Sequence, residues 1–200
     1  MTRKKLLPPL VAAIVLSAPS AAAPAPRQPE LHAESMSVVA SIAETGVRVR
    51  CTISDAFMFE PLGHADWKRR LIELAPSACR KLNALVARPA PPYSEASFAQ
   101  AESLLVLVHE SVHLSDYAGR TNEALTECRA IQLVREAART LGVDDVTARA
   151  LGHEAMRYDA QLPGPGHWLV GLREFPNYHS SDCYDGGPLD IHPDSQDWPN

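Results

Sequence analysis

The stretch LLVLVHESVH, residues 104–113, decides the fold and the chemistry that we expect of this chain. Its apolar run predicts a buried helix, on which His109 and His113 lie one turn apart on the same face. Their Cβ atoms would be about 6 Å apart, close enough for both imidazoles to bind one metal ion. Glu110 would then lie beside that ion, on the side where a water molecule binds. The pattern H-E-x-x-H therefore predicts a zinc hydrolase in which Glu110 is the general base.

A catalytic zinc ion usually has three protein ligands, and the third is expected in the segment NEALTEC, residues 122–128. In two antiparallel helices, residues that face each other have residue numbers with a constant sum. His113 would then face Glu123, and the same sum pairs His109 with Glu127. We expect Glu123 as the third ligand and Glu127 as the acceptor for the free N–H of His109. A turn centred later would instead place Glu127 opposite His113 as the ligand.

This pairing requires two neighbouring antiparallel helices, which we expect over residues 95–117 and 122–140. Ser94 is a residue type that caps helix N-termini, so it marks the start of the first helix. The residues between the helices predict a short turn, in which Gly119 takes a left-handed conformation and Thr121 starts the second helix.

Residues 104–128 resemble the gluzincins, zinc metallopeptidases whose third ligand is a glutamate on the helix that follows H-E-x-x-H. In thermolysin-like members this glutamate stands in an Asn-Glu-Ala-x-Ser-Asp sequence, and residues 122–127 of this chain are NEALTE. The short linker between the second histidine and the glutamate is similar to that of compact minigluzincins. The rest of the chain resembles only loosely small secreted proteins of high-GC bacteria. The resemblance implies zinc as the cofactor, Glu110 as the general base and peptide-bond hydrolysis.

The N-terminus predicts export. Basic residues 3–5 precede an apolar stretch, residues 6–18, which is followed by small residues. That stretch is short and contains two prolines, so it is poorly suited to span a bilayer. We expect residues 1–22 to be a signal peptide, residues 23–30 a Pro/Ala-rich spacer, and the mature protein to be secreted or in the cell envelope. An uncleaved anchor is the alternative.

The mature chain is expected to be one zincin-like domain, residues 31–200, with an extended C-terminal tail. Roughly 170 residues suffice for a sizeable core. The formal net charge is −5 and becomes −8 once the three basic residues 3–5 are removed. A mildly acidic chain argues against nucleic acid as a partner. We expect no stable membrane span after residue 30.

The four cysteines, an even number in an exported chain, predict two disulfides. We favour Cys51–Cys79 in the N-terminal half, which leaves Cys128–Cys183 to join the second helix of the site to the tail. The other two pairings remain open. The chain has no C-x-x-C pair, so cysteine ligands for zinc are not expected.

The remaining pattern predicts an α+β fold, with a small β-sheet packed on a helical bundle. Residues 47–53 alternate at a period of two, and the basic cluster 67–70 reads as the exposed start of a strand. By the gluzincin resemblance, one strand between residues 47 and 75 would bind an extended peptide through its main chain. The expected helices cover about 31–45, 76–86, 95–117, 122–140 and 145–161, and the expected strands 47–53, 56–59 and 70–74.

The expected function is a secreted zinc metalloendopeptidase acting on peptides or proteins. A second hydrogen-bond donor usually helps such a site, and we favour His179 for this role. The other candidates for the donor are His153, Tyr158, His167 and Tyr178. Two other functions remain open: a non-catalytic envelope or binding protein on a zincin-like scaffold, and a zinc amidase acting on the cell wall.

Overall fold

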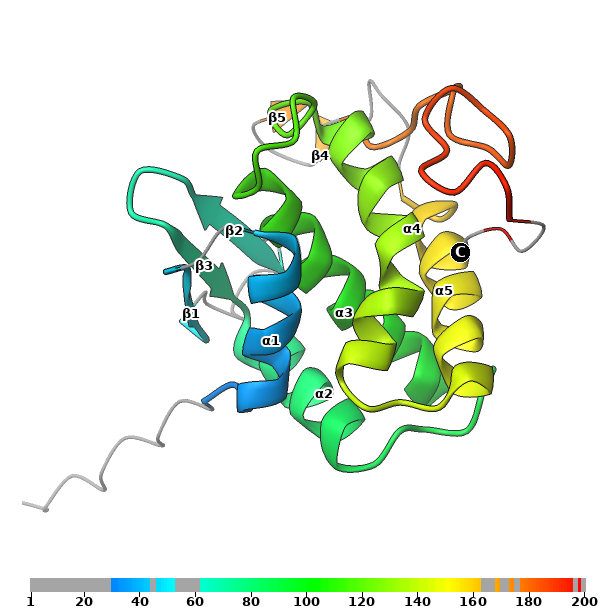
Figure 1. Cartoon of the computed structure of the whole chain (residues 1–200). Helices are drawn as coiled ribbons and strands as arrows, with labels where there is room; N and C mark the ends of the chain where they lie inside the picture. The colour runs from blue at the N-terminus through cyan, green and yellow to red at the C-terminus, as the bar shows by residue number, and fades with distance from the viewer. Residues whose placement is uncertain are drawn as a thin grey trace, which may run out of the picture.

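The structure is a computed structural model that describes residues 30–43, 46–52, 62–162, 168–169, 173–174, 177–195 and 198. Within these residues, helices form the larger layer and a small sheet packs on one side of it (Figure 1). The predicted α+β fold is confirmed. The expected signal peptide, residues 23–29 of the spacer, the strand at 56–59 and His167 lie outside the described residues.

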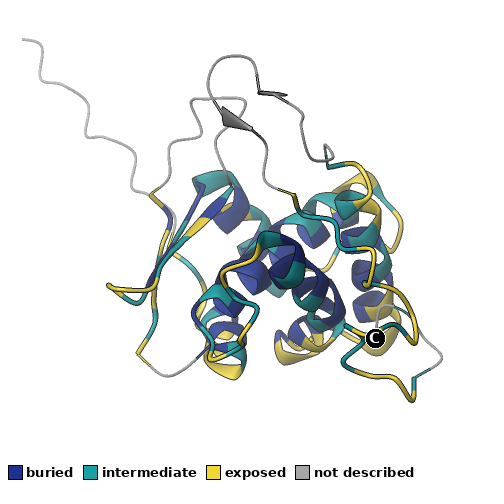
Figure 2. Cartoon of the chain, turned by 90° about the horizontal axis from the view of Figure 1, so that it is seen from above, coloured by how far each residue is buried: buried dark blue, intermediate teal, exposed yellow. Residues whose placement is uncertain are grey.

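Helix α3 (Glu95–His113), which carries the H-E-x-x-H pattern, is the centre of the molecule. It contacts every other helix and also two strands of the sheet. Leu104, Leu105, Leu107 and Val108 on this helix are almost completely buried, and each contributes on the order of 1.5–3 kcal/mol to stability. The helices around it are α1 (Ala33–Ile42), α2 (Pro76–Ala87), α4 (Glu123–Thr140) and α5 (Asp145–Asp159). Figure 2 shows that the buried residues face the interior of this bundle.

The sheet has the strand order β1-β3-β2, with β1 (Arg48–Arg50) parallel and β2 (Gly63–Asp66) antiparallel to β3 (Leu71–Leu74). Strand β2 therefore lies at the edge of the sheet, beside α3. Strand β2 was not predicted from the sequence, because Gly-His-Ala-Asp contains no β-branched residue and none of Phe, Tyr and Trp. Residues 67–70 were wrongly expected to begin a strand; they form the turn between β2 and β3. A short antiparallel pair, β4 (Trp168–Leu169) and β5 (Arg173–Glu174), precedes the C-terminal residues.

Helix α3 begins where the sequence predicts but ends earlier. Ser94 accepts a hydrogen bond from the backbone of Ser97, whose hydroxyl accepts one from the backbone of Ser94, so the N-terminus is capped reciprocally. At the other end, the backbone N–H of Leu114 bonds to the carbonyl of Ser111, which tightens the last turn. The helix therefore ends at His113 instead of residue 117.

The connection to α4 also differs from the prediction. Asn122, not Thr121, caps α4, because its side chain accepts a hydrogen bond from the backbone of Leu125. Gly119 does not take a left-handed conformation. A Cβ atom there would lie 2.6 Å from a ring carbon of Tyr117, so a larger residue would require this ring to move. Gly142, which follows α4, does take a left-handed conformation, with a φ of +82°.

Both predicted disulfides are formed. Cys51–Cys79 joins the end of β1 to α2, and Cys128–Cys183 joins α4 to the C-terminal residues. Disulfides of this kind fit an extracellular protein. Among the helices that the structure describes, none has both the length and the apolar character needed to cross a membrane.

Candidate metal centre

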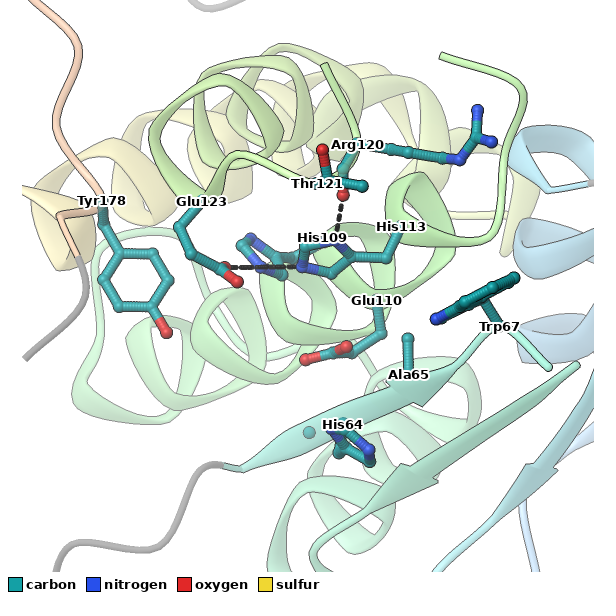
Figure 3. A pocket seen from close by; sticks show the side chains of 11 residues that line it. His64, Ala65, Trp67, His109, Glu110, His113, Arg120, Thr121, Glu123 and Tyr178 are labelled. Atoms are coloured by element: carbon teal, nitrogen blue, oxygen red, sulfur yellow. Dashed lines mark hydrogen bonds and ion pairs between the residues drawn. The ribbon is translucent and has the colours of Figure 1, made fainter. Parts of the chain in front are cut away.

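Three side chains from two helices bring their donor atoms together. His109 and His113 lie one turn apart on α3, and Glu123 is the first residue of α4 (Figure 3). The Nε2 atoms of the two histidines are 3.0 Å apart. The Oε2 atom of Glu123 is 3.1 Å from Nε2 of His109 and 3.4 Å from Nε2 of His113. This is the cluster expected from the antiparallel pairing of the helices.

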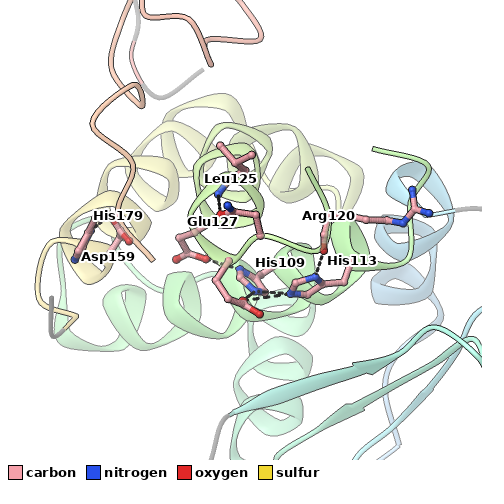
Figure 4. Close-up of polar contacts among 9 residues, drawn as sticks. His109, His113, Arg120, Leu125, Glu127, Asp159 and His179 are labelled. Carbon is pink, nitrogen blue, oxygen red and sulfur yellow. Dashed lines mark hydrogen bonds and ion pairs between the residues drawn. The ribbon is translucent and has the colours of Figure 1, made fainter. Parts of the chain in front are cut away.

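The opposite nitrogen of each imidazole is held from outside the cluster. Nδ1 of His109 is 2.5 Å from Oε2 of Glu127, and Nδ1 of His113 donates to the backbone carbonyl of Arg120 (Figure 4). A carboxylate and a carbonyl only accept hydrogen bonds, so each Nδ1 carries a hydrogen. Both Nε2 atoms therefore face the carboxylate of Glu123 and are available as ligands.

The charges in this cluster are balanced by protons in the metal-free chain. Burial opposes protonation of His109, but its hydrogen bonds to Glu123 and Glu127 outweigh this effect and raise its pKa to about 10. The hydrogen bonds from His109 and His113 hold the pKa of the Glu123 carboxyl well below its usual range, although burial acts in the opposite direction. A proton thus lies where a cation would bind.

The donor set fits a divalent metal ion. A tetrahedron with metal–ligand bonds of about 2.0–2.2 Å has edges of about 3.3–3.6 Å. The three distances between donor atoms, 3.0, 3.1 and 3.4 Å, are close to these edges. Two nitrogen lone pairs and a carboxylate oxygen would repel one another at such distances unless a cation or a proton lay among them. His109, His113 and Glu123 could therefore hold a metal ion.

Glu110 lies next to the cluster, on the side that faces the sheet (Figure 3). Burial raises the pKa of its carboxyl, and the nearby His109 and His113 partly oppose this effect. Strand β2 approaches Glu110 closely at Gly63. A Cβ atom on Gly63 would lie 2.8 Å from Cγ of Glu110 and 2.6 Å from Cγ1 of Val106. Only glycine therefore lets the edge strand lie this close to α3.

The cluster of His109, His113 and Glu123 opens into a cleft of about 480 Å³ between α3, the start of α4 and β2. Trp67 lies at one end of this cleft and Tyr178 at the other (Figure 3). Trp67 is 69% exposed, so an aromatic surface is available to a bound molecule. The cleft is lined by Gly63, His64, Ala65, Trp67, His109, Glu110, His113, Arg120, Thr121, Glu123 and Tyr178.

His179, the favoured hydrogen-bond donor in the sequence analysis, does not line this cleft. Its Nδ1 atom is 3.4 Å from Oδ2 of Asp159, and its Nε2 atom is 3.3 Å from the carbonyl of Leu162. Both ring nitrogens are directed at α5 and the residues that follow it (Figure 4). The neighbouring Tyr178 lines the cleft instead, with its ring centroid 5.8 Å from that of His109. His153 and Tyr158 on α5 are not among the lining residues.

Two contributors to the site were missed in the sequence. The carbonyl of Arg120 orients His113, but a backbone carbonyl has no signature in a sequence. The role of Gly63 could have been recognised only from its close approach to Glu110, which lies 47 positions away in the sequence.

None of the protein-family models, curated proteins and solved structures with which the chain was compared matches it. The resemblance to gluzincins therefore depends on residues 104–128 alone.

Proposed function

We propose that this protein is an exported zinc metallopeptidase of the gluzincin type. The observation that carries the proposal is the convergence of His109, His113 and Glu123 beside a buried glutamate, Glu110, in an open cleft. Two imidazole nitrogens and one carboxylate oxygen form a donor set that suits zinc. The two disulfides support an oxidising compartment, where such a protein would meet extracellular substrates.

A zinc ion held by these side chains would lower the pKa of water and polarise the scissile carbonyl. Glu110 accepts a proton from the attacking water and delivers it to the leaving nitrogen. Its raised pKa suits both transfers, because a buried carboxylate holds a proton more readily than an exposed one. Glu127 and the Arg120 carbonyl keep the two imidazoles in the tautomer that binds metal.

The edge strand β2 supports a peptide as the substrate. It pairs with β3 on one side, and among the described residues no strand pairs with its other side. Gly63, His64 and Ala65 of this strand line the cleft. An extended peptide would add to the edge of β2 through main-chain hydrogen bonds, and its scissile bond would then lie near Glu110.

The test is Glu110→Gln in the mature, disulfide-bonded chain. The variant keeps the volume of the side chain and removes the base, so we expect zinc at one equivalent and no cleavage of a peptide library, as followed by mass spectrometry. Glu136→Gln, on an exposed position of α4, is the matched control and should cleave normally. Unchanged turnover in Glu110→Gln would exclude Glu110 as the base.

The same assay distinguishes a peptidase from the two alternatives, a cell-wall amidase and a non-catalytic binding protein. Cleavage of peptidoglycan fragments, with the peptide library left intact, would identify a cell-wall amidase. One equivalent of bound zinc without cleavage of either substrate would identify a non-catalytic binding protein. Absence of bound metal after incubation with zinc would overturn the proposal.

A further inference from the structure

The turn between β2 and β3, residues 67–70, projects from the sheet. In Figure 1 it extends beyond the two strands, away from the layer of helices. Trp67, Lys68 and Arg69 are all exposed. Arg70 takes a left-handed conformation, with a φ of +49°, where the chain turns back into β3. A projecting turn cannot enclose a small ligand, so a partner that it binds must offer a surface of its own.

Trp67 is the apolar part of this turn. Tryptophan is usually largely buried in folded proteins, but this side chain is 69% exposed. The Nζ atom of Lys68 lies 5.5 Å from the centre of the Trp67 ring, so a positive charge stands beside the indole. An indole is apolar over most of its area and has one polar N–H. It therefore suits a surface that is apolar within and charged outside.

The turn also lies in a basic part of the sheet. Arg48, an exposed residue of β1, donates a hydrogen bond to the carbonyl of Arg69. The Arg69 guanidinium holds the pKa of the Asp66 carboxyl below its usual range, so these two residues form a neutral ion pair. Among the residues that the structure describes, no carboxylate forms an ion pair with Lys68 or Arg48. A local positive charge therefore remains, in a chain whose formal net charge is −5.

We propose that this turn docks the protein on an anionic membrane: Trp67 inserts its indole among the lipid headgroups, and Lys68 and Arg48 bind the lipid phosphates. Indole rings settle at the level of the headgroups, and basic side chains are attracted to anionic lipids. A bilayer offers the broad surface that a projecting turn requires. Trp67 also lines the cleft, so docking would bring one end of the cleft to the bilayer. The inference concerns binding alone and does not depend on the proposed peptidase function.

The test is flotation of the mature, disulfide-bonded chain with lipid vesicles. We expect binding to vesicles that contain phosphatidylglycerol and little binding to vesicles of phosphatidylcholine alone. Binding should be lost in about 1 M salt, where the Debye length is only about 3 Å. Equal binding to both kinds of vesicle would overturn the inference, because the basic side chains would then contribute nothing.

Two variants test the named residues, each with a matched control. Each unit of charge changes binding to an anionic surface by about fivefold, so Lys68→Glu should weaken it by about 20-fold. Arg88→Glu reverses the charge of an exposed residue at the end of α2 and should have little effect. Trp67→Ala should weaken binding by about tenfold, because part of its apolar area is no longer buried. Tyr184→Ala removes another exposed aromatic ring and should bind normally.

The other outcomes are equally informative. Absence of binding to phosphatidylglycerol vesicles at low salt would overturn the inference, as would equal losses in Lys68→Glu and Arg88→Glu. If soluble polyglutamate binds as tightly as the vesicles and Trp67→Ala leaves vesicle binding unchanged, the turn recognises acidic peptides and not a membrane. All four substitutions change exposed residues, and an unchanged Tm shows that each variant keeps the fold. None of these results depends on whether the protein cleaves peptides.

Discussion

His109 and His113 are oriented by hydrogen-bond partners of different kinds. The effect of this difference on the affinity for a metal ion can be measured. Glu127 is a buried carboxylate, so it adds a negative charge behind His109, whereas His113 is held by a neutral carbonyl. A carboxylate in this position makes the imidazole a better donor to a metal ion.

We expect Glu127→Gln to weaken zinc binding by about 10–100-fold, because the amide can still accept the hydrogen bond but carries no charge. Competition with a chromogenic chelator measures the affinity. Glu136→Gln on the same helix is the control and should bind zinc normally. Equal affinities of the two variants would mean that Glu127 does not support His109.

The protons in the metal-free cluster would make the binding of a zinc ion depend on pH. The pKa of His109 is raised from 6.5 to about 10, so its ion pairs contribute stability that is fully present below pH 6.5 and lost as the pH rises through about 10. A zinc ion would have to displace this proton, so we expect the affinity for zinc to rise with pH across the neutral range. Calorimetry at pH 7 in two non-coordinating buffers of different ionisation enthalpy should show release of at least one proton. Release of none would contradict the protonation assigned to His109.

The sequence predicted the residues of this cluster well, for a local reason. The spacing of a helix fixes His109 relative to His113, and a short turn limits how Glu123 and Glu127 can face them. Among the described candidates for the hydrogen-bond donor, the one that lines the cleft, Tyr178, could not be predicted in the same way. Its position depends on the path of residues 177–195, which is set by contacts with α4 and α5 between residues up to 59 positions apart in the sequence.

At the scale of elements, helices were predicted better than strands. The helices α2, α3, α4 and α5 all begin at a proline or a capping residue that the sequence shows. Strand β2 has no comparable signal, and it exists because it pairs with β3 and fits against α3 at Gly63. Its formation is a tertiary effect, so local propensity could not reveal it.

The cap of α4 is expected to matter for metal binding as well as for stability. Asn122→Ala removes the side chain that fixes the first turn of α4, where Glu123 lies, and should cost about 1 kcal/mol of stability. Ser94→Ala removes the cap of α3 at the end far from the cluster and should cost a similar amount. Denaturant unfolding measures both costs. Only Asn122→Ala should also weaken zinc binding, and equal zinc affinities would show that the cap does not position Glu123.

At the scale of the whole molecule, the candidate centre lies where three parts of the described chain meet. Helices α3 and α4 supply the donor atoms. The sheet approaches the centre at Gly63, and residues 177–195 approach it at Tyr178. The disulfides Cys51–Cys79 and Cys128–Cys183 lie in the N-terminal and C-terminal halves respectively, so neither of them crosses the cleft. A bound metal ion would therefore add a cross-link between α3 and α4 that the disulfides do not provide.

Zinc should accordingly raise the stability of the folded chain. At a free zinc concentration 100 times the dissociation constant, linkage predicts a gain of about 2.7 kcal/mol. For a chain of this size, such a gain corresponds to a rise in Tm of about 5–10 °C. Thermal unfolding with zinc and with a chelator measures the shift. In Glu123→Gln the charged donor from α4 is lost, so the rise in Tm caused by zinc should shrink to a small fraction of that in the original chain. An equal shift in the variant would place the stabilising zinc at a different site, because binding between α3 and α4 requires Glu123.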